Sequence, residues 1–108
     1  MQIELPQPVA AFFKLSNGED DATLESCLAD DVVVHDEGGE YRGRDAALSW
    51  LREAQRKYAY VVEPLVVTHQ ANTVEVVARV AGSFPGGSAE LDHVFQLADG
   101  KIRALQIQ

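Results

Sequence analysis

Three ionisable residues of this sequence, Asp36, Asp92 and His93, stand beside or within apolar runs, where acid–base chemistry is possible. Side chains of a strand alternate between its two faces, so Asp36 shares a face with Val32 and Val34. If that face points to the core, Asp36 enters an apolar pocket. Such a pocket disfavours the charged form of a carboxylate, which suits the group to proton transfer.

The pair Asp92 and His93 can supply only one side chain to such a pocket, because neighbouring residues of a strand point to opposite faces. Leu91, His93, Phe95 and Leu97 share one face, and this pattern favours an inward histidine. An inward Asp92 is the alternative that the sequence leaves open.

Each of these residues also has an ordinary structural interpretation. Asp36 can be a solvated aspartate at the end of a strand, beside the turn formed by residues 38–39. His93 can be a histidine of the core or of a dimer interface whose nitrogens are satisfied by a neighbour.

Composition and charge bound the class of protein. The 108 residues amount to one domain, which we expect to span residues 1–108. The net charge of -8 argues against nucleic acid and anionic membrane as partners, because both carry negative phosphates. No secretion signal is found, and no apolar run approaches the roughly 20 residues of a membrane span. We therefore expect a cytoplasmic protein.

The sequence predicts no cofactor and no metal. Cys27 is the only cysteine, so neither an intrachain disulfide nor a cysteine-based zinc site can form. The glycine pairs at 38–39 and 86–87 fit hairpin turns rather than a phosphate-binding loop. The pairs 35–36 and 92–93 combine histidine with aspartate, but the two members of each pair point to opposite faces of a strand.

Apolar periodicity predicts helices in the first half of the chain and strands in the second, which is typical of an α+β protein. Pro6 and Pro8 suit the start of the first helix, and Asn17 with Gly18 suits its end. Pro64 indicates an edge strand or a bulge. The predicted helices cover residues 6–16, about 20–28 and 44–57, and the predicted strands cover residues 31–36, 40–42, 61–69, 73–84, 88–97 and 101–107.

Three local sequences in this order resemble the nuclear transport factor 2-like superfamily, in its SnoaL-like and ketosteroid isomerase-like branch. They are residues 28–36, residues 41–47 followed by Trp50, and residues 92–97 before the turn at 99–100. The resemblance implies a cone-shaped, curved antiparallel sheet wrapped around three N-terminal helices, a cystatin-like α+β roll. It also implies an apolar pocket at the mouth of the cone, and a homodimer.

The resemblance implies candidate catalytic residues as well. In ketosteroid isomerase the base is an aspartate at the end of the first strand, and Asp36 stands at the matching spacing after Asp31. The second acid of that enzyme matches Asp92 in an ungapped alignment, and His93 if the gap falls in the preceding turn. Its tyrosine donor on the first helix is replaced by Phe12, which has no hydroxyl group.

The aromatic residues expected to line the pocket are Phe12, Phe13, Trp50, Phe84 and Phe95. The tyrosines at positions 41, 58 and 60 flank the third helix, and one of them could supply the missing hydroxyl group; spacing does not select which.

Two functions follow as expectations. The first is a cofactor-free enzyme of isomerase or cyclase type that binds a small apolar carbonyl compound, with Asp36 accepting a proton and His93 stabilising the enolate oxygen or returning the proton. The second is a non-catalytic ligand-binding or dimerisation module of the same fold, because one fold hosts many functions.

Overall fold

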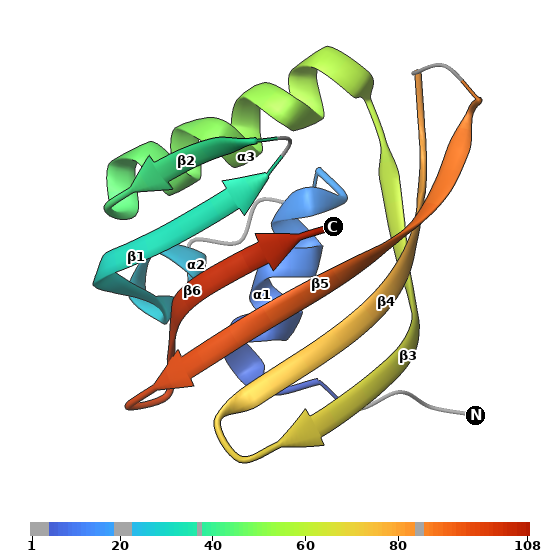
Figure 1. The fold of residues 1–108 in the computed structure, drawn as a ribbon. Helices are drawn as coiled ribbons and strands as arrows, with labels where there is room; N and C mark the ends of the chain where they lie inside the picture. Colours follow the sequence, from blue (N-terminus) through green and yellow to red (C-terminus); the bar gives the residue numbers. More distant parts are fainter. Residues whose placement is uncertain (1–4, 19–22, 37, 84–85) are drawn as a thin grey trace.

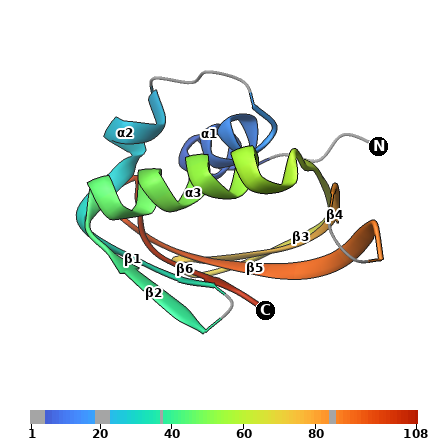
Figure 2. The ribbon, with the colours of Figure 1, turned by 90° about the horizontal axis from the view of Figure 1, so that it is seen from above.

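The structure is a computed structural model that describes residues 5–18, 23–36, 38–83 and 86–108. Within these ranges, three helices lie on one side of a curved six-stranded sheet (Figures 1 and 2). The helices are α1 (Gln7–Ser16), α2 (Thr23–Cys27) and α3 (Arg44–Tyr58). The strands are β1 (Leu28–Asp36), β2 (Gly39–Arg42), β3 (Val61–Gln70), β4 (Thr73–Ala81), β5 (Ser88–Ala98) and β6 (Lys101–Ile107). The expected α+β class is confirmed.

The sheet has the order β2-β1-β6-β5-β4-β3 and does not close into a barrel. Strands β3 to β6 form an antiparallel meander, whereas β1 pairs with β6 in parallel, with Val34 opposite Leu105. The sheet is therefore mixed, and it differs at this pair from the expected antiparallel sheet. β1 and β6 come from the two halves of the chain, so the local sequence patterns of the two strands do not reveal that they pair in parallel.

Local signals position most of the elements. Asp99 and Gly100, with φ of 54° and 74°, form the tight turn between β5 and β6 that was expected from their residue types. Pro64 lies on β3, an edge strand, and the register between β3 and β4 shifts after it, so both expectations for this proline hold. Strand β1 begins at Leu28, which was expected in a helix, and β4 ends at Ala81, three residues before its expected end.

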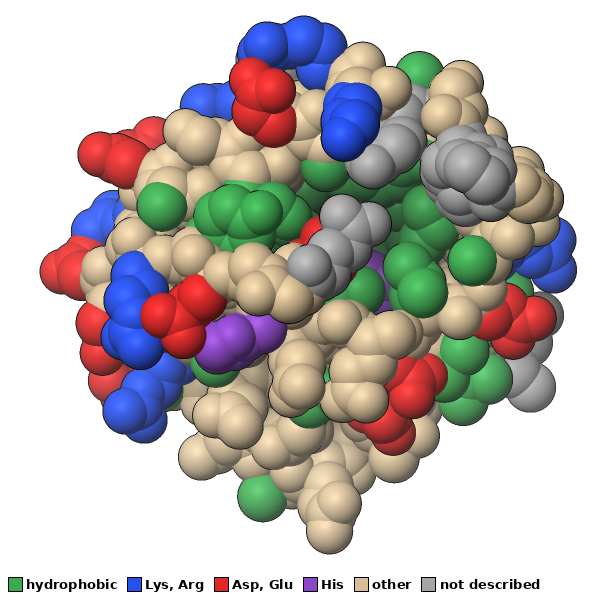
Figure 3. All heavy atoms as spheres, turned by 45° about the horizontal axis from the view of Figure 1, so that its top comes forward, with side chains coloured by type: hydrophobic (Ala, Val, Ile, Leu, Met, Phe, Trp, Pro, Cys, Tyr) green, Lys and Arg blue, Asp and Glu red, His purple; other side chains and the backbone are tan. Residues whose placement is uncertain are grey.

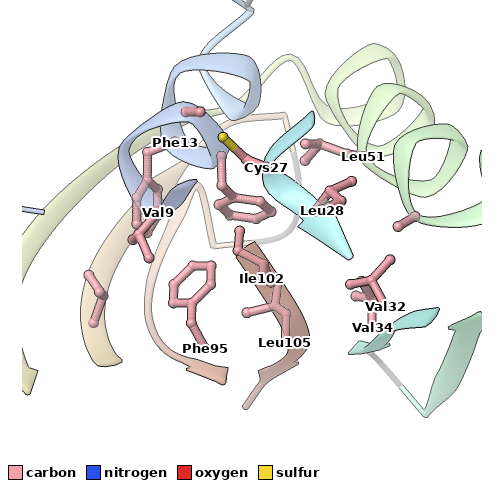
Figure 4. Close-up of a cluster of buried hydrophobic side chains, with 14 of the residues drawn as sticks. Val9, Phe13, Cys27, Leu28, Val32, Val34, Leu51, Phe95, Ile102 and Leu105 are labelled. Carbon is pink, nitrogen blue, oxygen red and sulfur yellow. The ribbon is translucent and has the colours of Figure 1, made fainter. Parts of the chain in front are cut away.

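The core lies between the concave face of the sheet and the helices. Along β4 the residues Val74, Val76, Ala78 and Val80 are buried, as strand alternation requires. Figure 4 shows side chains from α1, β1, α3, β5 and β6 meeting in this cluster, with Phe95 fully buried in it. In the described residues, no helix is long and apolar enough to cross a lipid bilayer.

We expect Phe95→Ala to lower the free energy of unfolding by about 3–5 kcal/mol, because it leaves a cavity in a fully packed region. Chemical denaturation measures this change. Arg52→Ala on the exposed face of α3 is the control and should change stability by less than about 0.5 kcal/mol. A loss below about 1 kcal/mol for Phe95→Ala would contradict the packing described here.

Candidate functional site

An open cavity of about 860 Å³ lies between α1, α3 and the concave face of the sheet. Its size suits a small organic ligand. Figure 3 shows the hollow, with hydrophobic side chains on its walls and acidic and histidine side chains visible inside it. Polar groups from different elements reach it, and those that bear on its chemistry are Ser16, Asp36, Tyr60 and His93.

Small side chains on the helical wall leave this space open. Ala46, Ser49 and Ala54 of α3 line the cavity, and Ala89 of β5 lines it from the sheet. At the other end of the concave face, large side chains such as Phe95 fill the corresponding volume. The cavity and the core therefore lie in the same layer between helices and sheet, and the cavity forms where the side chains of this layer are small.

Asp36 is the last residue of β1 and lines the cavity in a half-buried position. The indole Nε1 of Trp50 donates a hydrogen bond to its Oδ2 over 3.1 Å. The Trp50 ring packs against the rings of Phe12 and Tyr41, with centroid distances of 6.3 Å and 5.9 Å. This aromatic stack fixes the indole, and the indole in turn fixes the carboxylate.

His93 on β5 lines the same cavity and is only 3% exposed. The rings of Phe12, Phe13 and Phe95 surround it at centroid distances of 6.2 Å, 5.4 Å and 6.3 Å. Burial lowers the pKa of His93 below its usual 6.5, although the backbone carbonyls of Leu91 and Val76 and the charge of Asp92 act in the opposite direction. The ring is therefore neutral at pH 7.

One tautomer of this neutral ring matches its contact with the backbone. Nδ1 of His93 lies 3.2 Å from the carbonyl oxygen of Leu91, which can only accept a hydrogen bond. The tautomer with its hydrogen on Nδ1 satisfies this contact and leaves the lone pair on Nε2. In that tautomer the neutral ring offers an acceptor rather than a donor.

Asp92 lies on the other face of the sheet. It pairs with Val77, a residue of the outer face, while His93 pairs with the buried Val76. The amide and carbonyl of Asp92 bond with those of Gln108 at the end of β6. Its carboxylate does not line the cavity, so among the described residues Asp36 and His93 are brought together and Asp92 is not.

The expected aromatic lining is corrected in part. Phe12 and Trp50 line the cavity. Phe13 and Phe95 do not, because Phe13 faces the core from α1 and Phe95 lies two residues further along β5, where the concave face is filled. Phe84 lies outside the described residues.

Several lining residues were missed by sequence reasoning. Ala46, Glu53 and Lys57 line the cavity from the same face of α3 as the expected Trp50, at spacings of three or four residues, so helical periodicity could have found them. Tyr60 was one of three tyrosines that spacing could not separate, and it lines the cavity just after α3.

Two amide side chains hold the helical wall to the sheet. Asn17, at the end of α1, accepts a hydrogen bond from the amide of Val62 over 2.6 Å and donates to its carbonyl over 3.1 Å. Gln55 of α3 donates to the carbonyls of Ser16 and Tyr60 over 2.7 Å and 3.3 Å. These bonds join α1, α3 and β3 where Ser16 and Tyr60 enter the cavity.

His35, the other histidine that stands beside an aspartate in the sequence, does not line the cavity with His93. His35 is exposed, and its Nε2 lies 3.8 Å from Glu40 on β2 rather than beside a second histidine. Within the described ranges, no group of three histidine, cysteine or acidic side chains could hold a metal ion.

Comparison with known proteins places this geometry in a family. The profile of the SnoaL-like domain matches residues 9–105. The chain is 38% identical to a provisionally assigned polyketide cyclase from Sinorhizobium meliloti, with a TM-score of 0.90, and the match covers 96% of this chain and 95% of that one. No curated protein matches the sequence.

Two more distant structures share the fold. A Catenulispora acidiphila protein with a ketosteroid isomerase-like fold, in complex with trimethylamine, is 17% identical with a TM-score of 0.84 over 97% of this chain and 86% of that one. An LEH-like epoxide hydrolase from M. tuberculosis is 23% identical, with a TM-score of 0.77 over 94% of this chain and 79% of that one.

The lowered pKa of His93 predicts a pH dependence of stability. As pH falls below about 6.5, the unfolded chain binds a proton at this position more readily than the folded chain, so the free energy of unfolding decreases; above that pH His93 contributes no slope. Denaturation from pH 5 to pH 8 at fixed protein concentration should show a shallower dependence for His93→Phe than for the wild type.

The exposed His69 on β3 provides the matched control. His69→Gln should leave the pH dependence as in the wild type. If His93→Phe retains the full wild-type slope between pH 5 and pH 6.5, His93 is not held neutral by burial.

Proposed function

This chain belongs to the SnoaL-like domain family, and we propose that it is a cofactor-free enzyme that transfers a proton on a small apolar carbonyl compound. The observation that carries the proposal is the convergence of Asp36 from β1 and His93 from β5 on one largely apolar cavity. The relatives at high coverage include a provisionally assigned polyketide cyclase and an epoxide hydrolase, which supports an enzyme of this family.

In the proposed reaction, Asp36 is the base. Its carboxylate takes a proton from the carbon next to the ligand carbonyl, the C–H electron pair forms a carbon–carbon double bond, and the carbonyl electron pair moves to oxygen. If the ligand is a β,γ-unsaturated ketone, the dienolate regains the proton from Asp36 at the γ-carbon and the carbonyl is restored. In a cyclisation, the enolate carbon instead attacks a second carbonyl carbon of the same molecule, and the oxygen of that carbonyl takes the proton from Asp36. The Trp50 hydrogen bond holds one carboxylate oxygen, so the geometry of the base is set before the ligand binds.

His93 enters the proposal as a hydrogen-bond acceptor. In the tautomer of its neutral ring with the hydrogen on Nδ1, directed to Leu91, Nε2 can accept from an enol or hydroxyl group of the ligand. With the ring hydrogen on Nδ1, donation from Nε2 of His93 to an enolate oxygen requires a second proton on the ring, which burial disfavours. The proton that returns to carbon is therefore assigned to Asp36.

A ligand-binding module without catalysis is the second candidate. The favouring observation is Phe12, which lines the cavity where the resemblance to ketosteroid isomerase implies a tyrosine donor. Binding and catalysis are separable here because Trp50 is the only tryptophan and lines the cavity, so its fluorescence reports ligand binding directly.

The enzyme proposal predicts exchange of the protons next to a ketone group. In deuterated buffer the wild type should accelerate deuterium uptake by 2-tetralone, an apolar ketone, as measured by mass spectrometry. Asp36→Asn should reduce the acceleration by about 10²–10⁴-fold, because the amide keeps a partner for Trp50 but cannot accept the proton.

Asp92→Asn is the control, since it changes an aspartate that does not line the cavity. Its exchange rate should equal that of the wild type. Fluorescence binding without any exchange above the buffer rate would favour the binding module. If Asp92→Asn loses exchange and Asp36→Asn retains it, the base is Asp92 and the proposed assignment to Asp36 is wrong.

We also propose that the protein is a cytoplasmic homodimer. Val66 is 55% exposed on the outer face of β3, and Val77 lies opposite it on β4, so the two valines form a short apolar strip on the convex face of the sheet that ends at Asp92 on β5. Such a strip is a suitable contact for a second copy of the chain. The net charge of -8 disfavours nucleic acid as a partner.

Sedimentation velocity at micromolar concentration should therefore give the mass of a dimer. Val77→Arg should shift the protein toward monomer, since it places a charge in the apolar strip. Arg52→Ala, on the exposed face of α3, should leave the dimer unchanged. A wild-type monomer at these concentrations would exclude the dimer.

A further inference from the structure

The two cavity residues of the proposed reaction leave the ligand oxygen without a donor. Asp36 is a carboxylate, and the neutral ring of His93, with its hydrogen on Nδ1, offers only its Nε2 lone pair, so both accept hydrogen bonds. An enolate oxygen gains stability from a preorganised donor. A donor must therefore come from another cavity wall.

Tyr60 provides a hydroxyl group on the wall where α1, α3 and β3 meet. It lines the cavity together with Ser16, which is 1% exposed and whose side chain, as a hydrogen-bonding neighbour, acts to lower the pKa of Tyr60. The Ser16 hydroxyl donates to the carbonyl of Phe12 over 2.9 Å. The neighbour of the Tyr60 hydroxyl is thus anchored to the backbone of helix α1.

We infer that Tyr60 donates a hydrogen bond to the carbonyl oxygen of the ligand, and that Ser16 positions the Tyr60 hydroxyl for this contact. The inference deepens the proposed function and rests on it in one respect, that the ligand carries such an oxygen. It makes Tyr60 a specificity-determining residue for carbonyl compounds.

The Ser16 hydroxyl can support this donation without any movement of its heavy atoms. When its hydrogen turns from the Phe12 carbonyl to the Tyr60 oxygen, the hydrogen of Tyr60 is released for the ligand. The Phe12 carbonyl keeps a partner, because in a helix the amide of Ser16 also donates to it. Reorientation of the Ser16 hydroxyl therefore leaves no buried carbonyl without a hydrogen bond.

The backbone of Tyr60 is fixed as well. Ala59 adopts a left-handed conformation, with φ of 47°, that ends α3 and turns the chain toward β3. Gln55 then donates to the Tyr60 carbonyl. A donor held in this way loses little conformational freedom when a ligand binds.

Charge also keeps the Tyr60 hydroxyl in its donor form. Burial raises the pKa of Tyr60 above 10.0, and the negative charge of Asp36 raises it further, while the Ser16 hydrogen bond acts in the opposite direction. The phenol therefore holds its hydrogen throughout the physiological range. The influence of Asp36 also indicates that the two groups act on the same region of the cavity.

Tyr41 is the other tyrosine whose side chain lines the cavity in the described residues. Its hydroxyl lies over Gly39, where an added Cβ would approach it to 3.1 Å, and its ring packs on Trp50. Tyr41 thus belongs to the stack that supports the base, at the β1–β2 turn. It has no counterpart of the buried Ser16 contact.

The test compares two ligands that differ in one oxygen, 2-tetralone and the hydrocarbon tetralin. Their dissociation constants are measured from Trp50 fluorescence for the wild type, Tyr60→Phe, Ser16→Ala and Tyr41→Phe. Tyr60→Phe should weaken 2-tetralone by about tenfold and leave tetralin unchanged, so that the preference for the ketone disappears. Ser16→Ala should reduce the preference by a smaller factor.

Equal weakening of both ligands in Tyr60→Phe would make Tyr60 a purely structural residue and overturn the inference. Loss of the preference in Tyr41→Phe instead would overturn it too, as would a wild type that does not prefer the ketone. These readouts require no turnover. A Tyr60-dependent preference without deuterium exchange would retain the inference and refute the enzyme proposal.

Discussion

Large side chains fill only part of the space between the concave face of the sheet and the helices, and the rest of the structure depends on this incomplete filling. At one end Phe13, Phe95 and Leu105 close the space between sheet and helices. At the other end the facing positions hold Ala46, Ser49 and other small side chains. One continuous layer is therefore a core at one end, where close packing of large side chains leaves little room, and a cavity at the other.

Polar groups at the open end are held by contacts that belong to the core itself. The stack of Phe12, Trp50 and Tyr41 carries the indole that bonds Asp36. His93 is enclosed by phenylalanine rings, which keep it neutral. The site is thus rigid before any ligand arrives, and preorganisation of this kind lowers the cost of binding and of charge development.

Local patterns were sufficient for much of the fold. Strand alternation predicts a face shared by Leu91, His93 and Phe95, and the structure buries His93 and Phe95 on the concave side. The turn at 99–100 and the bulge near Pro64 follow from residue type. These features depend on neighbours in the sequence, which explains why the sequence reports them.

Features set by distant segments were not predictable in this way. The parallel pairing of β1 with β6 joins the two halves of the chain. The separation of Phe12, at the cavity, from Phe13, in the core, depends on where the sheet closes against α1. The place of Tyr60 in the cavity, beside Ser16 of α1, depends on how α3 and β3 pack against α1.

A crystal structure with 2-naphthol, a planar mimic of the enolate, is the most direct test of the proposed site. We expect the naphthol oxygen to lie within hydrogen-bonding distance of the Tyr60 hydroxyl and the ring to lie beside Asp36. A ligand bound outside the cavity, or one with its oxygen directed to solvent, would contradict the proposed site.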